Sequence, residues 1–212
     1  MKPTTKKIYD ELFERYPTLN SVKAEIMRAF ETLFETTKKN GTIYVCGNGG
    51  SAADSEHIVG ELMKSFRKRR PIKQDVFNNL SSYGEDGERL KRTLEGAIRT
   101  ISLTSHISLS TAFANDKEPT VVFAQQLYGL AKAGDVLIVI STSGNSENCY
   151  LAAITAKAVG IPVVAMTGSK ESKLSDISDV TIKVSETETY KIQELHLPVY
   201  HCLCAMLEEE TF

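Results

Sequence analysis

The 212-residue sequence contains no tryptophan and only four cysteines, Cys46, Cys149, Cys202 and Cys204. Because they are few and stand within apolar runs, a disulfide scaffold is excluded, and we expect core thiols in a reducing cytoplasm. Cys202 and Cys204 could ligate a metal, but two such positions on a helix point about 200° apart. That geometry favours packing in the core over metal binding.

The sequence also lacks an excess of either charge, because its formal net charge is −2 and its pI is near 6.1. Composition therefore gives no case for nucleic acid or an anionic membrane as a partner. No apolar run approaches the roughly 18 residues of a membrane span. The polar segment 1–7 leads into no apolar stretch, so we expect no signal peptide. A hydrophobic content of 42% predicts a globular protein, with one domain over residues 1–212.

The order of apolar patterns along the chain predicts the fold. Helical spacing over residues 6–39, interrupted at Pro17, predicts N-terminal helices within 1–40. Five short apolar runs then alternate with helical patterns, which predicts an α/β protein, a three-layer αβα sandwich on a doubly wound, five-stranded parallel sheet. The expected strands are residues 42–46, 99–104, 136–140, 163–167 and 180–184. A last helix is expected over 187–210, kinked at Pro198.

One stretch, about residues 71–95, has few structural signals and is expected to be a helical insertion, with a short charged helix at 88–94. The basic run at residues 67–70 precedes it. We interpret that run as a solvated surface. The alternative is that it receives the phosphate of a substrate bound by a neighbouring copy.

The most informative stretch is a strand and glycine turn at residues 45–54, Val-Cys-Gly-Asn-Gly-Gly-Ser-Ala-Ala-Asp. Glycines let the backbone turn sharply and approach a ligand closely. The free N–H groups at the start of the following helix, with Ser51 among them, favour an anion. The glycine spacing differs from Gly-x-Gly-x-x-Gly, which argues against a dinucleotide cofactor.

A second polar turn follows the apolar run 136–140. Its hydroxyls, with the N–H groups of the next helix, would form a neutral cradle for a phosphate dianion. Serine capping of the helix is the simpler alternative. The hydroxyl residues are Ser141, Thr142, Ser143 and Ser146. Because ligands of doubly wound sheets bind beyond the carboxyl ends of the strands, the two turns together predict a phosphorylated small molecule.

Candidate acid/base residues and metal ligands occur on two expected helices, the one that follows the glycine turn and the last one in the sequence. His57 and Glu61 lie four residues apart and share a helix face. Gln193 and His201 are separated by about 80° and roughly 12 Å, so both reach one site only if their side chains lean together. His196 lies about 140° from His201, so only one of them is expected in a given pocket. Two imidazoles and two oxygens suit Zn²⁺ or proton transfer.

These motifs occur with Ala114-Asn115-Asp116 and Gly134-Asp135-Val136-Leu137 in the order found in sugar isomerase (SIS) domain proteins. The chain resembles that family over nearly its whole length, apart from roughly residues 71–95. Within the family it is similar to the phosphoheptose isomerase group, on His57, Glu61, Gln193 and His201. The resemblance implies a flavodoxin-like SIS fold and a homotetramer with active sites between subunits. It also implies isomerisation of sedoheptulose 7-phosphate to D-glycero-D-manno-heptose 7-phosphate.

The resemblance further implies a role for each matching residue. The sugar would contact Asn48, Gly49, Gly50, Asn115 and Asp116. The phosphate would be held by Ser51, Ser141, Thr142, Ser143 and Ser146. Zinc would be bound by His57, Glu61, Gln193 and His201, of which Glu61 and Gln193 also face the substrate.

A ketose–aldose interchange moves a proton between C1 and C2 through an enediol and needs an acid or a metal at the oxygen. The family's acid/base pair corresponds to Glu61 and His201. We assign Glu61 as the proton shuttle and His201 as the partner at the oxygens. If zinc occupies both residues, the metal would polarise the carbonyl instead.

Three positions differ from the family pattern. Ser65 stands where relatives commonly have arginine, and Tyr190-Lys191 stands where they often have Asp-Arg. Another phosphosugar is therefore an alternative substrate. A non-catalytic alternative is a replication regulator that binds the initiator protein; it resembles Cys202-Leu203-Cys204 but lacks the counterpart of Glu61. A sugar-phosphate sensor is a further alternative, but it would need a DNA-binding module for which 212 residues leave no room.

Overall fold

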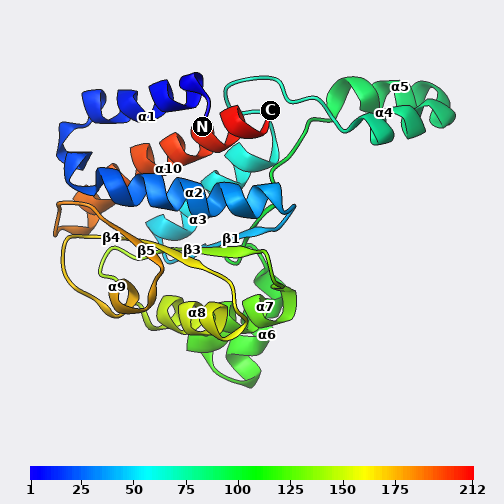
Figure 1. Ribbon diagram of the computed structural model, residues 1–212. Coiled ribbons are helices and arrows are strands. Elements are labelled where there is room, and N and C mark those ends of the chain that lie inside the picture. The colour runs from blue at the N-terminus through cyan, green and yellow to red at the C-terminus, as the bar shows by residue number, and fades with distance from the viewer.

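The computed structural model describes residues 1–212 and has one sheet between two layers of helices (Figure 1). All neighbouring strands are parallel, in the order β2-β1-β3-β4-β5. The strands are β1 (Ile43–Gly47), β2 (Thr100–Ser102), β3 (Val136–Ile140), β4 (Val163–Thr167) and β5 (Val180–Lys183). The predicted doubly wound sheet of five parallel strands is confirmed.

The central strands explain why the sheet lies between two layers. Every residue of β1, β3 and β4 is buried, as expected for parallel strands covered on both faces. In the register of β1 and β3, Gly47 lies beside Ile140, at the carboxyl end of each strand. The glycine turn and the serine-rich turn therefore begin side by side at one edge of the sheet.

One helical layer contains both ends of the chain and surrounds the last helix, α10. The elements of this layer are α1 (Pro3–Arg15), η1 (Pro17–Val22), α2 (Lys23–Lys38), α3 (Gly50–Met63) and α10 (Thr189–Thr211). Helix α10 packs against α1, α2 and α3, and it is continuous through Pro198. None of the helices has both the length and the apolar character needed to cross a membrane.

The opposite layer covers the other face of the sheet. It consists of α6 (Ile107–Asp116), η3 (Pro119–Val121), α7 (Val122–Leu130), α8 (Glu147–Ala158) and α9 (Lys173–Ile177). Cys46 and Cys149 belong to the apolar cluster on this side, and Cys202 and Cys204 belong to the cluster on the other. All four cysteines are buried and free, which confirms the predicted core packing.

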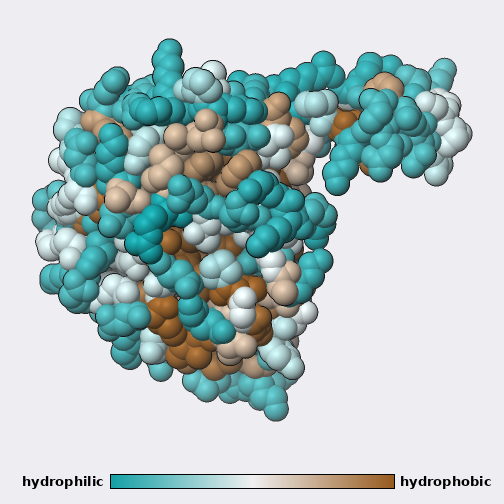
Figure 2. Space-filling model, in the orientation of Figure 1, coloured by the Kyte–Doolittle hydropathy of each residue, from teal (hydrophilic) through white to brown (hydrophobic).

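Residues 71–95 form an arm that projects from the body of the molecule (Figure 1). Its elements are α4 (Gln74–Leu80), η2 (Ser81–Tyr83) and α5 (Gly84–Thr93), which pack on one another. Its surface is mostly hydrophilic (Figure 2), although Phe77 and Tyr83 are exposed. At its base the carboxylate of Glu95 accepts hydrogen bonds from the Ser65 backbone N (2.9 Å) and Oγ (2.8 Å).

The interpretation of the basic run as a solvated surface is wrong for Arg70. Its guanidinium is fully buried and donates to Glu208 Oε1 at 2.7 Å. It also donates to the carbonyl oxygens of Leu62 (2.6 Å) and Glu61 (2.8 Å) at the end of α3. The carboxylate of Glu208, on α10, also accepts hydrogen bonds from the backbone N–H groups of residues 66 and 67. Arg70 is therefore a structural clamp on the end of α3.

Candidate functional site

The two polar turns are joined by a pair of amides at the carboxyl ends of β1 and β3. Asn48 Nδ2 donates to Asn148 Oδ1 at 2.8 Å, and Asn148 Nδ2 donates back to Asn48 Oδ1 at 2.9 Å. Gly49 has a φ of 56°, a left-handed conformation that favours glycine and starts α3. The structure thus holds Asn48 against the start of α8, a contact that the sequence did not predict.

A polar pocket of about 280 Å³ lies at this edge of the sheet. Of the residues predicted to hold phosphate, Thr142 and Ser143 line it, whereas Ser141 Oγ donates to Ser146 Oγ at 3.1 Å. Ser51 is buried in the first turn of α3. The other polar residues of the lining are Asn145, Ser169, Lys170, Glu171, Glu186, Thr187 and Thr189.

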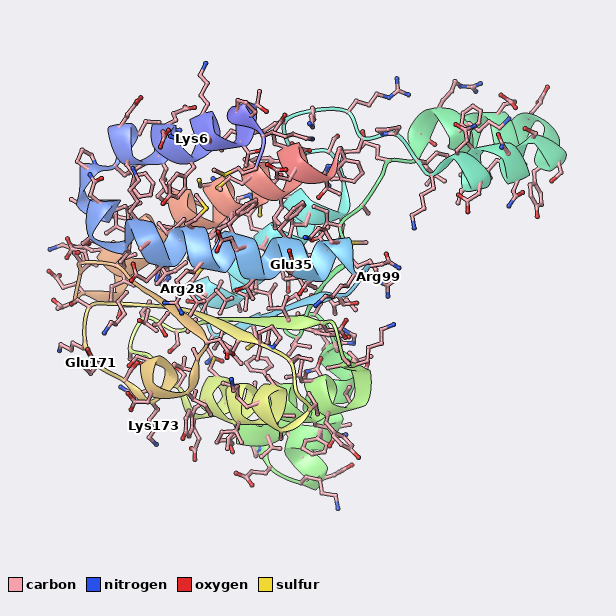
Figure 3. All side chains as sticks on the ribbon, in the orientation of Figure 1. Lys6, Arg28, Glu35, Arg99, Glu171 and Lys173 are labelled. Atoms are coloured by element: carbon pink, nitrogen blue, oxygen red, sulfur yellow. The ribbon has the colours of Figure 1, made fainter.

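The charged residues that line this pocket are Lys170, Glu171 and Glu186. Glu171 pairs with Lys183 Nζ at 2.6 Å, whereas Lys170 makes no ion pair. Glu171 lies in the segment that leads from β4 to α9, and Lys173 is the first residue of α9 (Figure 3). A cationic side chain, several hydroxyls and the nearby start of α8 suit a phosphate group.

Three predicted residues meet between helices α3 and α10. His57 Nε2 lies 3.1 Å from Glu61 Oε1 and 3.5 Å from His201 Nε2. The Glu61 side chain is 14% exposed and that of His57 is 43% exposed, so the cluster is open to a ligand. Burial, together with the neighbouring His57, lowers the pKa of His201 and favours the neutral imidazole that can accept a proton.

His57 is held from behind by Tyr200. The Tyr200 hydroxyl donates to Asp54 Oδ1 at 3.0 Å, and His57 Nδ1 lies 3.0 Å from the same hydroxyl. Burial and the Asp54 carboxylate raise the pKa of Tyr200, so its hydroxyl remains protonated. Burial also raises the pKa of Asp54.

Helix α10 connects the pocket to this cluster. Its first turns bring Ile192 to the wall of the pocket and Gln193 to the start of α3. A Cβ atom on Gly50 would lie 2.5 Å from Gln193 Nε2, so glycine is required there for this contact. His201 follows eight residues later, roughly 12 Å along the helix. Helix α10 therefore spans from the pocket to the histidine cluster, although Ile192 and His201, nine residues apart, lie about 180° apart around its axis.

Asn115 and Asp116 are not brought to the other predicted residues. They end α6, which packs against η3 and α7 in the opposite helical layer. Asn115 Nδ2 donates to Asp116 Oδ1 at 2.9 Å, and neither side chain bonds to another predicted site residue.

His196 points away from the cluster. Its side chain is fully buried, its Nε2 lies 3.3 Å from the Thr167 carbonyl oxygen, and its Nδ1 has no partner. Burial lowers the pKa of His196 to about 4. Of the two histidines on α10, only His201 takes part in the site.

His196 should make the protein less stable in acid. Its pKa is about 6.5 when unfolded and about 4 when folded, so the unfolded state takes up the proton first as pH falls. The free energy of unfolding should therefore decrease by about 3 kcal/mol between pH 7 and 4 through this residue. Urea unfolding across that range should show a shallower pH dependence for His196→Asn. The control His106→Gln should keep the wild-type slope, and an unchanged slope for His196→Asn would contradict the assignment.

The donor set of the cluster suits a zinc ion. Two imidazole nitrogens and a carboxylate oxygen, from His57, His201 and Glu61, are ligands that zinc commonly takes. However, no group of three or more His, Cys, Asp or Glu side chains is arranged as a metal site. The residue types thus suit zinc, but their side chains are not placed around one point as the ligands of a bound ion would be.

Comparison with known proteins identifies the family. A model of the SIS domain matches residues 11–95 and 92–168. The chain belongs to the SIS domain family. Within that family it belongs to the phosphoheptose isomerase group, as the similarity to individual members shows. It is 32% identical to the phosphoheptose isomerase of Akkermansia muciniphila, over 94% of this chain and 92% of the relative. It is 35% identical to that of a Nitratiruptor species, over 95% of this chain and 97% of the relative.

Solved structures of SIS domain proteins show the same architecture. The phosphoheptose isomerase GmhA from Neisseria gonorrhoeae superposes with a TM-score of 0.72 at 28% identity, over 97% of this chain and 94% of that chain. A phosphoheptose isomerase from Francisella tularensis gives a TM-score of 0.73 at 25% identity, over 99% of this chain and 100% of that chain.

Proposed function

We propose that the chain is the isomerase that interconverts sedoheptulose 7-phosphate and D-glycero-D-manno-heptose 7-phosphate. One observation carries this proposal: Glu61 and His201 both lie beside His57 at the middle of α10, and a hydroxyl-lined pocket lies at the start of the helix. The phosphoheptose isomerases that the chain resembles over nearly its full length support the choice of a heptose phosphate.

The phosphate would bind in the polar pocket. Thr142 and Ser143 provide hydroxyls, and Lys170 provides a positive charge, in a lining that also contains Glu186. The sugar chain would then extend along α10, past Gln193 and Gly50, towards Glu61. A phosphate bound at a fixed distance from Glu61 would place C1 and C2 of the sugar next to the Glu61 carboxylate. Orienting the substrate in this way would contribute to the rate of the reaction.

Glu61 would move the proton between C1 and C2, because its carboxylate is partly buried and faces the open side of the cluster. His201 would donate and accept protons at the sugar oxygens, because burial favours its neutral form. His57, in contact with both side chains, would hold them in place. The step is balanced: the proton that leaves C1 is returned to C2, and no oxidant is consumed.

Zinc is part of the proposal as a bound cofactor. His57, Glu61, His201 and Gln193 would hold it. Glu61 Oε1 and His201 Nε2 both lie within 3.5 Å of His57 Nε2, and Gln193 lies at the start of α3. When held by Glu61 and His201, zinc would polarise the substrate carbonyl and stabilise negative charge on its oxygen, in place of the proton transfer assigned to these two residues.

We further propose a cytoplasmic homotetramer with active sites between subunits. Asn115 and Asp116 lie apart from the cluster in their own chain, and they are exposed on α6. In an intersubunit site they would contact a sugar bound by a neighbouring copy. Buried, free thiols at all four cysteines are consistent with a reducing compartment.

The non-catalytic alternative gains no support. The residues that resemble the replication regulator, Cys202 and Cys204, are buried in the core, where they offer no surface to a partner. Glu61, which that regulator lacks, lies instead in the cluster.

A panel of ketose phosphates tests the proposed function. Heptulose 7-phosphate, hexulose 6-phosphate and pentulose 5-phosphate are assayed with the chelator-treated protein, before and after zinc is restored. We expect the heptulose to react fastest and zinc to increase its turnover. Faster turnover of a shorter ketose would reassign the substrate, and zinc-independent turnover would remove the metal from the proposal.

A further inference from the structure

A short hydrogen-bond chain ends on the back of His57. It runs from the half-buried carboxylate of Asp54 through the buried hydroxyl of Tyr200 to His57 Nδ1, with both oxygen–oxygen and oxygen–nitrogen separations at 3.0 Å. The other ring nitrogen of His57, Nε2, faces Glu61 Oε1 and His201 Nε2. The two nitrogens of one imidazole thus have different partners.

The protons of this chain can be assigned from its members. A carboxylate accepts hydrogen bonds only, and a phenol has a single proton to donate. Because the Tyr200 hydroxyl donates that proton to Asp54, its oxygen can only accept from His57. His57 must therefore have its proton on Nδ1, and in the neutral ring its Nε2 is unprotonated.

Glu61 competes for the same proton, because His57 could donate to it through Nε2 instead. In that arrangement Tyr200 would have to donate to Nδ1. The Asp54 carboxylate and the Tyr200 oxygen would then face each other at 3.0 Å with no proton between them. Two adjacent acceptors are strongly unfavourable where one of them is buried, as the Tyr200 oxygen is. A proton on Nδ1 also leaves two acceptors, His57 Nε2 and Glu61 Oε1, 3.1 Å apart, but the His57 side chain is 43% exposed there, so water can donate to both. Asp54 therefore decides which nitrogen of His57 is protonated.

We propose that Asp54 and Tyr200 are positioning residues that hold the proton of His57 on Nδ1 and present its unprotonated Nε2 to Glu61 and His201. The Tyr200 ring also packs edge-on against both imidazoles, with centroid distances of 5.6 Å to His57 and 4.9 Å to His201. A histidine whose rear nitrogen is fixed in this way is oriented and tautomerically ready to bind a metal ion.

The tautomer can be measured without zinc or substrate. Long-range proton–nitrogen NMR spectra of histidine-labelled, metal-free protein are recorded at alkaline pH, where the imidazole is neutral. Wild-type His57, assigned with a His57→Gln variant, should have Nδ1 protonated. Tyr200→Phe keeps the ring but removes the hydroxyl, and Asp54→Ala frees the hydroxyl to donate to His57. Both variants should show the proton on Nε2; an unchanged tautomer in Tyr200→Phe would overturn the proposal.

Zinc affinity provides a second readout, which rests on the proposed function. Competition with a chromophoric chelator should show zinc binding about 10–100-fold weaker in Tyr200→Phe. The matched control is Tyr9→Phe. The Tyr9 hydroxyl, on α1, donates to the carbonyl oxygen of Lys23, on α2, away from the cluster. This variant should bind zinc as the wild type does. Equal affinity in Tyr200→Phe and Tyr9→Phe would overturn the positioning role. If the wild type binds no zinc, the proposed metal fails while the tautomer result still decides this inference.

Discussion

Replacing Glu61 with glutamine should lower kcat for the ketose phosphate about 10²–10⁴-fold, the contribution typical of a positioned general base. The amide keeps the size and polarity of the side chain next to His57 but cannot accept and return a proton. Binding should be largely intact, because the phosphate pocket lies at the other end of the site. Steady-state kinetics and calorimetric titration of sedoheptulose 7-phosphate measure the two effects separately.

The matched control for this variant is Glu56→Gln on the same helix. Glu56 is exposed and accepts a hydrogen bond from Thr104 at 3.1 Å, outside the cluster. The Glu56→Gln variant should retain the wild-type kcat. Retained turnover in Glu61→Gln would eliminate Glu61 as the proton shuttle.

The buried ion pair between Arg70 and Glu208 should be the most costly pair to break in this chain. Glu208→Gln leaves the guanidinium buried without a counter-charge, and Arg70→Met leaves the carboxylate in the same position. Either change should lower the free energy of unfolding by about 3–5 kcal/mol. Urea unfolding at fixed protein concentration measures the loss.

A surface pair provides the comparison. Lys6 pairs with Asp10 one turn further along α1, and both side chains are solvent-exposed (Figure 3). Lys6→Gln should therefore change the free energy of unfolding by less than about 1 kcal/mol. A loss in Glu208→Gln no larger than that of Lys6→Gln would show that the clamp on α3 is not a stabilising element.

The sheet was predictable because its strands are nearly continuous apolar runs. Val136–Ile140 and Val163–Thr167 have the predicted bounds, since burial on both faces makes such runs distinct from amphipathic helices. The first helix of the arm, α4, was missed because none of its residues is buried, so it has no apolar stripe to detect. The longer helix α5 was expected only from residue 88, because the glycines at 84 and 87 are typical of a turn.

The site was predictable where it depends on spacing within one helix, and less so where it depends on tertiary contacts. His57 and Glu61 meet as their four-residue spacing predicts. Tyr200 looks like a core residue in sequence, and its partner Asp54 lies 146 positions away. Arg70 likewise looks solvated within a basic run until Glu208 is placed beside it. Patterns of neighbouring residues cannot predict contacts between residues that lie so far apart in the sequence.

The wild-type reaction with sedoheptulose 7-phosphate, run in D₂O and followed by NMR, tests the central claim most directly. The account predicts an aldose heptose 7-phosphate with deuterium at C2, because the proton taken from C1 by Glu61 can exchange with solvent before it is returned. Complete transfer of the C1 hydrogen to C2, with no deuterium in the aldose, would contradict the proton shuttle. No turnover of any ketose phosphate, with or without zinc, would contradict the isomerase itself.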